Sequence, residues 1–334
     1  MREPGVFAVS LDFELHWGCF ETMRVLDEPV QNYFLRTRKA IPEMLSLFSA
    51  GNIHVTWAAV GMLYRKNIKE WEENMPALLP SFVNPDVSAY EWIKKNGFSG
   101  DNDPFHFAPE LIELIKSTPH QEIGTHTYGH YFCLEEGQTK EQFREDIKMA
   151  CKVAREHGIE IRSLVFPRNQ FNRDYLSICK EAGITSVRSS PDIWYWSPAT
   201  GSGFMKKFFR AGDAYIRFQP IKPVYLKDIN TDSLPLLLPA TRLYRPWKPE
   251  YPLQNTFKMR RILNEMTVAA KNGAYYHIWW HPHNFGNHPQ ECLTELKQII
   301  DHYNSLKNKY GFQSLTMNEI TEQLLQKKQP HPVS

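Results

Sequence analysis

Short apolar runs alternate along the chain with segments of helical periodicity. The runs that predict β-strands cover residues 6–11, 53–59, 122–125, 161–166, 184–187 and 274–280. The segments that predict helices cover residues 33–50, 140–157, 175–182, 257–271, 292–306 and 320–326. Strands that alternate with helices are typical of parallel β-α units. The pattern therefore predicts an α/β fold with a parallel sheet, which can close into a barrel.

Polar residues follow several of the predicted strands at the point where the strand ends. Asp12, His126, Arg168 and His281 are the clearest cases. In parallel α/β folds the carboxyl ends of the strands meet at one edge of the sheet, and active sites form there. We therefore expect these four side chains to belong to one functional site.

Two long stretches, residues 66–108 and 189–252, interrupt the alternation and are rich in aromatic residues and proline. Loops of this length inside a compact domain are usually functional or separately folded. The alternative is a small satellite core packed beneath long loops. We expect a single domain over residues 1–326 that contains both stretches as insertions, followed by a disordered tail at 327–334.

Composition and charge exclude several classes of protein. The chain has 334 residues, of which 42% are hydrophobic, and Lys plus Arg (39) nearly balance Asp plus Glu (37). This balance argues against nucleic acid as a partner, and no apolar run is long enough to cross a bilayer. The first apolar run is too short for a signal peptide, so we expect a cytoplasmic protein. The five cysteines form no CxxC pair, which favours reduced thiols over disulfides or a thiolate metal site.

Two motifs carry groups that can bind a metal. His126 and His130 are four residues apart, so their imidazoles can converge on one ion, although an isolated HxxxH is more often a structural or exposed pair. Asp12 and Glu14 lie two residues apart after a strand and can both lean into one cleft. One could bind metal while the other acts as a base; the alternative is a helix-capping Asp beside a solvated Glu.

Two further segments supply candidate supporting groups. Arg168 directly follows a predicted strand and Pro167, where it can hold a carboxylate ionised; the alternative is an ordinary surface arginine. His277 and His281 share one face of the last apolar strand, and His281 lies at its carboxyl end. Packing alone is a poor reason to bury several histidines, since each ring nitrogen needs a partner.

Together these segments resemble the polysaccharide deacetylases, carbohydrate esterase family four, over residues 5–60, 121–190 and 274–285. His126-Thr127 and His130 match the family's His-Ser/Thr-x-x-His motif fully. Asp12 matches the base of the first motif, whose second Asp is replaced here by Phe13, and Glu14 fits a variant with the ligand two residues after the base. The resemblance implies a distorted (β/α) barrel of about seven parallel strands with long aromatic insertions.

The resemblance also implies roles for the remaining residues. Asp12 would be the base, His281 the acid and Arg168 the support of the base, while Glu14, His126 and His130 would hold a divalent metal. Zn²⁺ suits this ligand set best, and Co²⁺, Ni²⁺ and Fe²⁺ also suit it. Loose matches to a pocket-wall motif add the residues Asp192 and Trp194, and His277 is held in reserve as the acid or as a substrate contact.

The implied activity is metal-dependent removal of an N-acyl group, most simply acetyl, from an amino sugar. A cytoplasmic enzyme of this kind would meet nucleotide-linked or lipid-linked sugars or oligosaccharides in surface-polysaccharide synthesis. Two alternatives stay open: a glycoside hydrolase that uses Asp12 and Glu14 as its carboxylate pair, and a non-catalytic carbohydrate-binding descendant.

Overall fold

The computed structural model describes residues 3–190, 205, 212–213 and 223–328. Its strands are β1 (Val6–Phe13), β2 (Val55–Ala59), β3 (Gln121–Thr125), β4 (Ser163–Val165), β5 (Ser186–Ser189), β6 (Leu236–Pro239), β7 (Arg242–Leu243), β8 (Tyr275–Trp280) and β9 (Gln313–Ser314). Its helices are α1 (Glu28–Gly51), α2 (Ile68–Glu73), α3 (Ala89–Asn96), α4 (Pro109–Ser117), α5 (Lys140–Glu156), α6 (Leu176–Glu181), α8 (Pro252–Asn272), α9 (Pro289–Tyr310) and α10 (Met317–Lys328).

The strands form a parallel sheet in the order β6-β5-β4-β3-β2-β1-β8-β7, and β9 pairs with β1. Its two end strands, β6 and β7, are consecutive in the chain. The N–H of Ala240 donates to Ser189 of β5, while the N–H of Thr241 donates to His277 of β8. The single segment 236–243 therefore joins both edges of the sheet, and the predicted parallel α/β barrel is confirmed.

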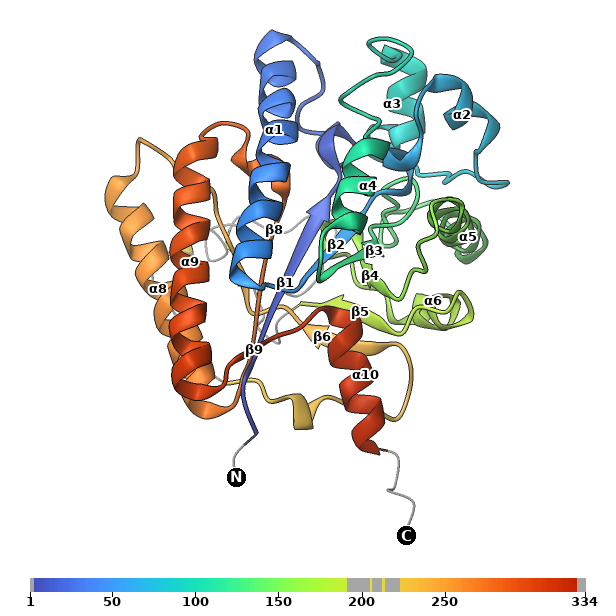
Figure 1. Ribbon diagram of the computed structural model, residues 1–334. Coiled ribbons are helices and arrows are strands. Elements are labelled where there is room, and N and C mark those ends of the chain that lie inside the picture. Colours follow the sequence, from blue (N-terminus) through green and yellow to red (C-terminus); the bar gives the residue numbers. More distant parts are fainter. Residues whose placement is uncertain (1–2, 191–204, 206–211, 214–222, 329–334) are drawn as a thin grey trace.

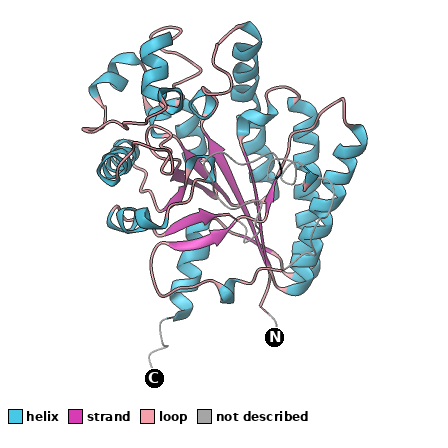
Figure 2. Ribbon diagram, turned by 180° about the vertical axis from the view of Figure 1, so that it is seen from behind, coloured by secondary structure: helices cyan, strands magenta, loops and turns pink. Residues whose placement is uncertain are grey.

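Helices surround the strands, as Figures 1 and 2 show. Helices α1, α8 and α9 lie on one side of the barrel, and α4, α5 and α6 lie on the other. All residues of β1 are buried, which explains why this strand reads as a continuous apolar run. The N-terminus lies at the end of the barrel opposite the arrowhead of β1, so the carboxyl ends of the strands face away from it.

The first predicted insertion, 66–108, is not an open aromatic loop. It contains α2 and α3, and its aromatic side chains are buried with the main core or pack against it. Trp71 and Tyr90 are each 7% exposed, and Phe107 is 3% exposed. These aromatic side chains therefore belong to the main core rather than to a separate satellite core beneath a long loop.

The structure also changes the predicted bounds of the second insertion, 189–252, and of the C-terminal tail, 327–334. The segment predicted as an insertion at 189–252 contains β6 and β7, because the short apolar run Leu236-Leu237-Leu238 completes the sheet. Helix α10 continues through Lys328, and Lys327 pairs with Glu3, so the helix extends two residues into the predicted tail. Among the described residues, every helix is too short or too polar to cross a bilayer.

Candidate metal centre and active site

The first group of the site comes from the end of β1. Asp12 is the penultimate residue of β1, and Glu14 is the first residue after the strand. Both side chains are buried, each 3% exposed. The 3₁₀ turn η1 (Leu15–Gly18) then brings Gly18 against Glu14, where an added Cβ would lie 1.9 Å from the carboxyl carbon. A glycine is thus needed at position 18 for Glu14 to keep its place.

The loop that follows β3 supplies the second group. Nε2 of His126 and Nε2 of His130 each lie 3.2 Å from Oε2 of Glu14. Nδ1 of His126 hydrogen-bonds the Val165 carbonyl at 2.8 Å, which turns Nε2 toward Glu14. The structure therefore brings Glu14, His126 and His130 together, all buried and with one donor atom of each within 4.8 Å of the others.

This histidine loop is held by a buried carboxylate from α5. Asp146 accepts the N–H groups of Tyr128 at 2.6 Å and Gly129 at 2.9 Å. Burial raises the pKa of Asp146 to about 7, although both N–H groups favour its ionised form. His130 adopts a positive φ of 53°, a conformation that side chains rarely take without such support.

Arg188, rather than Arg168, lies against Asp12. Its Nη1 and Nη2 donate to the two Asp12 oxygens at 2.6 and 2.8 Å, and Nη1 also donates to Ser10 at 3.0 Å. Burial opposes ionisation of Asp12, but Arg188, followed by His126 and His281, holds the pKa of Asp12 below its ordinary value.

The expectation that Arg168 supports the base is wrong. Its side chain is 43% exposed, pairs with Glu21 and lies 3.9 Å from Glu135. Arg168 has a positive φ of 53° in the turn after β4, and its guanidinium lies over the Phe132 ring. Arg188, inside β5, comes from the next strand of the sheet and points into the barrel.

His281 lies at the carboxyl end of β8, as predicted. Its Nε2 is 3.7 Å from Oδ2 of Asp12 and 3.7 Å from Oε1 of Glu14, and its side chain is 27% exposed. It is therefore the accessible histidine among the groups around the two carboxylates. His281 can meet a substrate from solvent, whereas His126 and His130 cannot without displacing their neighbours.

His277 lies beneath the site and is fully buried. Its ring nitrogens meet the hydroxyls of Ser10 and Tyr275 at 2.8 and 2.7 Å. Burial, reinforced by Arg188, lowers the pKa of His277 to about 3, so the ring is neutral. The expectation that His277 contacts substrate is wrong; it supports Ser10, which in turn contacts Arg188.

Several residues of this centre were missed from the sequence, among them Arg188, Gly18, Cys19 and His283. Arg188 had a visible signal, because it is a charged residue inside an apolar strand. Cys19 and His283 are 264 positions apart, and no sequence pattern links them. Trp194 and Asp192 lie outside the described residues.

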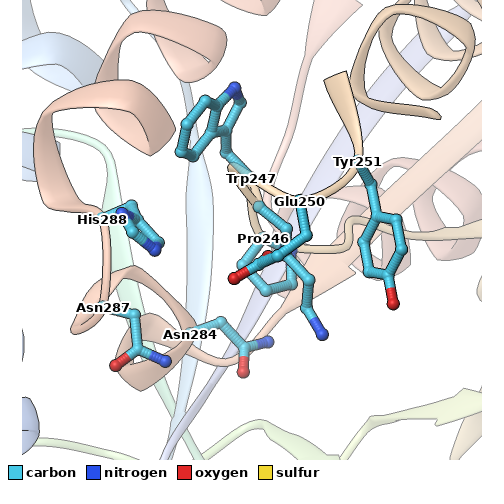
Figure 3. A pocket seen from close by; sticks show the side chains of 8 residues that line it. Pro246, Trp247, Glu250, Tyr251, Asn284, Asn287 and His288 are labelled. Carbon is cyan, nitrogen blue, oxygen red and sulfur yellow. The ribbon is translucent and has the colours of Figure 1, made fainter. Parts of the chain in front are cut away.

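A pocket of about 270 Å³ lies between the segments that precede α8 and α9 (Figure 3). The segment before α8 contributes Trp247 and Tyr251, and the segment before α9 contributes Asn284, Asn287 and other polar groups. Nδ2 of Asn284 lies 3.4 Å from Nδ1 of His281. Trp247 and Tyr251, both within the predicted insertion 189–252, therefore line a pocket that shares Asn284 with the surroundings of His281.

The chain was compared with known proteins. A family model described as polysaccharide deacetylase matches residues 33–187. A search of curated proteins found no match.

Solved structures share the fold at 13% sequence identity. A Mycobacterium smegmatis protein classed as a polysaccharide deacetylase covers 100% of this chain and 96% of its own length, with a TM-score of 0.60. A Pseudomonas aeruginosa PAO1 protein, also classed as a polysaccharide deacetylase, covers 98% of this chain and 91% of its own length, with a TM-score of 0.54. A 4-alpha-glucanotransferase from Thermococcus litoralis covers 96% of this chain and 40% of its own, also at 0.54. The family-model match and the shared barrel confirm the resemblance to the polysaccharide deacetylases found in the sequence.

Proposed function

We propose that the protein removes an N-acyl group, most simply acetyl, from an amino sugar with the help of a divalent metal. The observation that carries this proposal is the buried cluster of Glu14, His126 and His130 beside Asp12 and His281. The match to the polysaccharide deacetylase family model supports carbohydrate deacetylation in general. The cluster supports the finer statement, because three ligands that leave open positions are typical of catalytic metal sites.

The donor set fits a metal such as Zn²⁺. Two imidazole nitrogens each lie 3.2 Å from one carboxylate oxygen, close to the separation of neighbouring ligands around an ion at 2.0–2.2 Å. Nδ1 of His126 is occupied by a backbone carbonyl, which leaves Nε2 free to bind. When bound, the metal would lower the pKa of water and polarise the acyl carbonyl.

The protein side chains account for the proton transfers. Asp12 is kept ionised by bidentate hydrogen bonds from Arg188 and accepts a proton from the attacking water. His281, which reaches both carboxylates and remains accessible, gives a proton to the departing amine. The products are a carboxylate and a free amino sugar, so the bond that breaks is the amide C–N bond.

The pocket in Figure 3 supports a sugar as substrate. Trp247 and Tyr251 offer aromatic faces for a pyranose ring, and the amides of Asn284 and Asn287 can bond hydroxyl groups. As expected from the sequence, the proposed substrate is nucleotide-linked or lipid-linked. The proposed location is the cytoplasm.

The glycoside hydrolase alternative is less well supported, even though the glucanotransferase shares the barrel. That reaction needs two carboxylates free to act on the glycosidic bond. Here one oxygen of Glu14 is engaged by two buried histidines. A non-catalytic descendant would lack part of the machinery, whereas Asp12, Glu14, His126, His130 and His281 are all in place.

The test is metal content together with acetate release from N-acetylated amino sugars. We expect His126→Ala to lose metal and to abolish deacylation, since one of three ligands is removed. His302→Ala, in α9 and bonded to Thr267, is the control and should keep both. Full metal occupancy in His126→Ala would contradict the ligand assignment, and hydrolysis of a glycosidic bond without acetate release would contradict the reaction.

The role of His281 can be tested with two leaving groups. We expect His281→Ala to lower kcat on an N-acetyl sugar by roughly 10² to 10⁴, the range that general acid catalysis supplies. On an activated aryl acetate the loss should be much smaller, because that leaving group departs without a proton. Equal losses on both substrates would mean that His281 positions the substrate or its oxyanion instead.

A further inference from the structure

A second set of ligand-type side chains lies on the other oxygen of Glu14. Oε2 of Glu14 faces His126 and His130, whereas Oε1 lies 3.7 Å from Nδ1 of His283. Sγ of Cys19 is 3.4 Å from Nε2 of His283 and 3.9 Å from its Nδ1. One sulfur, one imidazole and one carboxylate oxygen therefore converge, each atom within 4.8 Å of the others.

The fold holds this group in place from two distant segments. Cys19 follows η1, and its N–H donates to the His16 carbonyl at 2.9 Å. His283 lies in the turn η8 (Pro282–Phe285), where the rings of Tyr33 and Phe34 from α1 pack beside it. Cys19 and His283 are each 7% exposed, so the group is largely closed to solvent.

A hydrogen bond alone explains this cluster poorly. Within the described part of the chain, the His283 ring nitrogens have only the Cys19 sulfur as a hydrogen-bond partner, and a thiol is a weak donor and acceptor. Burying an imidazole with so weak a partner is costly. A bound cation would satisfy all three groups at once.

The separations around one ring nitrogen suit a metal ion. Tetrahedral bonds of about 2.0–2.3 Å place neighbouring ligand atoms about 3.3–3.8 Å apart. Nδ1 of His283 lies 3.7 Å from Oε1 of Glu14 and 3.9 Å from Sγ of Cys19, close to the upper end of this range. Thiolate and imidazole ligands together suit Zn²⁺ and, as a spectroscopic substitute, Co²⁺.

We propose that Cys19, His283 and Oε1 of Glu14 bind a second divalent cation, with Glu14 bridging it to the ion on His126 and His130. Binding replaces the S–H bond of Cys19 by a metal–sulfur bond, and the thiol proton leaves to water. The centre would then hold two ions bridged by a carboxylate, an arrangement that other hydrolytic enzymes use. This inference rests on the proposed function because it shares Glu14 with the first metal position.

The test is the stoichiometry of metal binding by the full chain. Metal-free protein is loaded with Zn²⁺ or Co²⁺, desalted and analysed for metal. We expect two ions per wild-type chain and a thiolate-to-cobalt charge-transfer band in the near ultraviolet. Cys19→Ala and His283→Ala should each retain one ion, and Cys19→Ala should lose the band. Cys133→Ala, a buried cysteine bonded to the Gln170 carbonyl, is the matched control and should keep two ions and the band.

Cys19→Ser controls for a folding defect in Cys19→Ala. Serine keeps the approximate volume of the cysteine side chain but cannot give the thiolate band. Far-ultraviolet circular dichroism verifies each fold. One ion or none per wild-type chain, or two ions with an unchanged band in Cys19→Ser, would overturn the second site. One ion with intact deacylation would leave the proposed function standing, whereas two ions without deacylation would overturn the function and leave the second site standing.

Discussion

Asp12→Asn is expected to retain bound metal and to lose turnover by about 10²- to 10⁴-fold, the contribution of a general base. The amide keeps the volume of the carboxyl but cannot accept the water proton at neutral pH. Glu14→Ala is the contrasting variant, because Oε2 of Glu14 lies 3.2 Å from both ligand histidines. It should lose metal and activity together.

Metal analysis and kcat on one N-acetyl substrate distinguish the two carboxylates. Both variants must be assayed below their melting temperatures, because Asp12→Asn also deprives Arg188 of its buried anionic partner. The reverse result, with metal lost in Asp12→Asn and kept in Glu14→Ala, would mean that the roles of base and ligand are exchanged.

The parallel barrel could be predicted from the sequence because β1, β2, β4 and β8 are buried along their whole length. β1 is buried along its whole length, and such strands read as unbroken apolar runs. The segment 236–243 was harder to recognise, since it lies between prolines inside a stretch that otherwise lacks periodicity. Its strand character depends on pairing with β5 and β8, which is a tertiary effect.

The candidate site was predictable where its members are close in sequence. Asp12 with Glu14, and His126 with His130, carry their spacing within one segment. Arg168 was predicted because it follows a strand end, yet the positive φ at Arg168 turns the chain and its side chain pairs with Glu21. A strand residue that points into the barrel, such as Arg188, is closer to Asp12 than a loop residue after the neighbouring strand.

This comparison leads to a matched pair of arginine variants. Arg188→Met is expected to reduce the free energy of unfolding at neutral pH by about 3–5 kcal/mol, because it leaves Asp12 buried without its cation. Arg168→Met removes a half-exposed ion pair and should cost about 1 kcal/mol or less. Chemical denaturation of the two metal-free proteins measures both values, and similar losses would contradict the assignment of Arg188 as the partner of Asp12.

The pH dependence of stability and of kcat/KM tests the same two arginine variants in a second way. The folded protein lowers the pKa of Asp12 below its ordinary value of 3.8, so the pair stabilises the fold above that pH and the stabilisation is lost as pH falls through the lower value. The stability difference between wild type and Arg188→Met should therefore shrink in acid. Without Arg188, burial raises the pKa of Asp12, so the acid limb of the kcat/KM profile should move to higher pH. Arg168→Met should leave that limb in place, because its guanidinium pairs with Glu21 rather than Asp12.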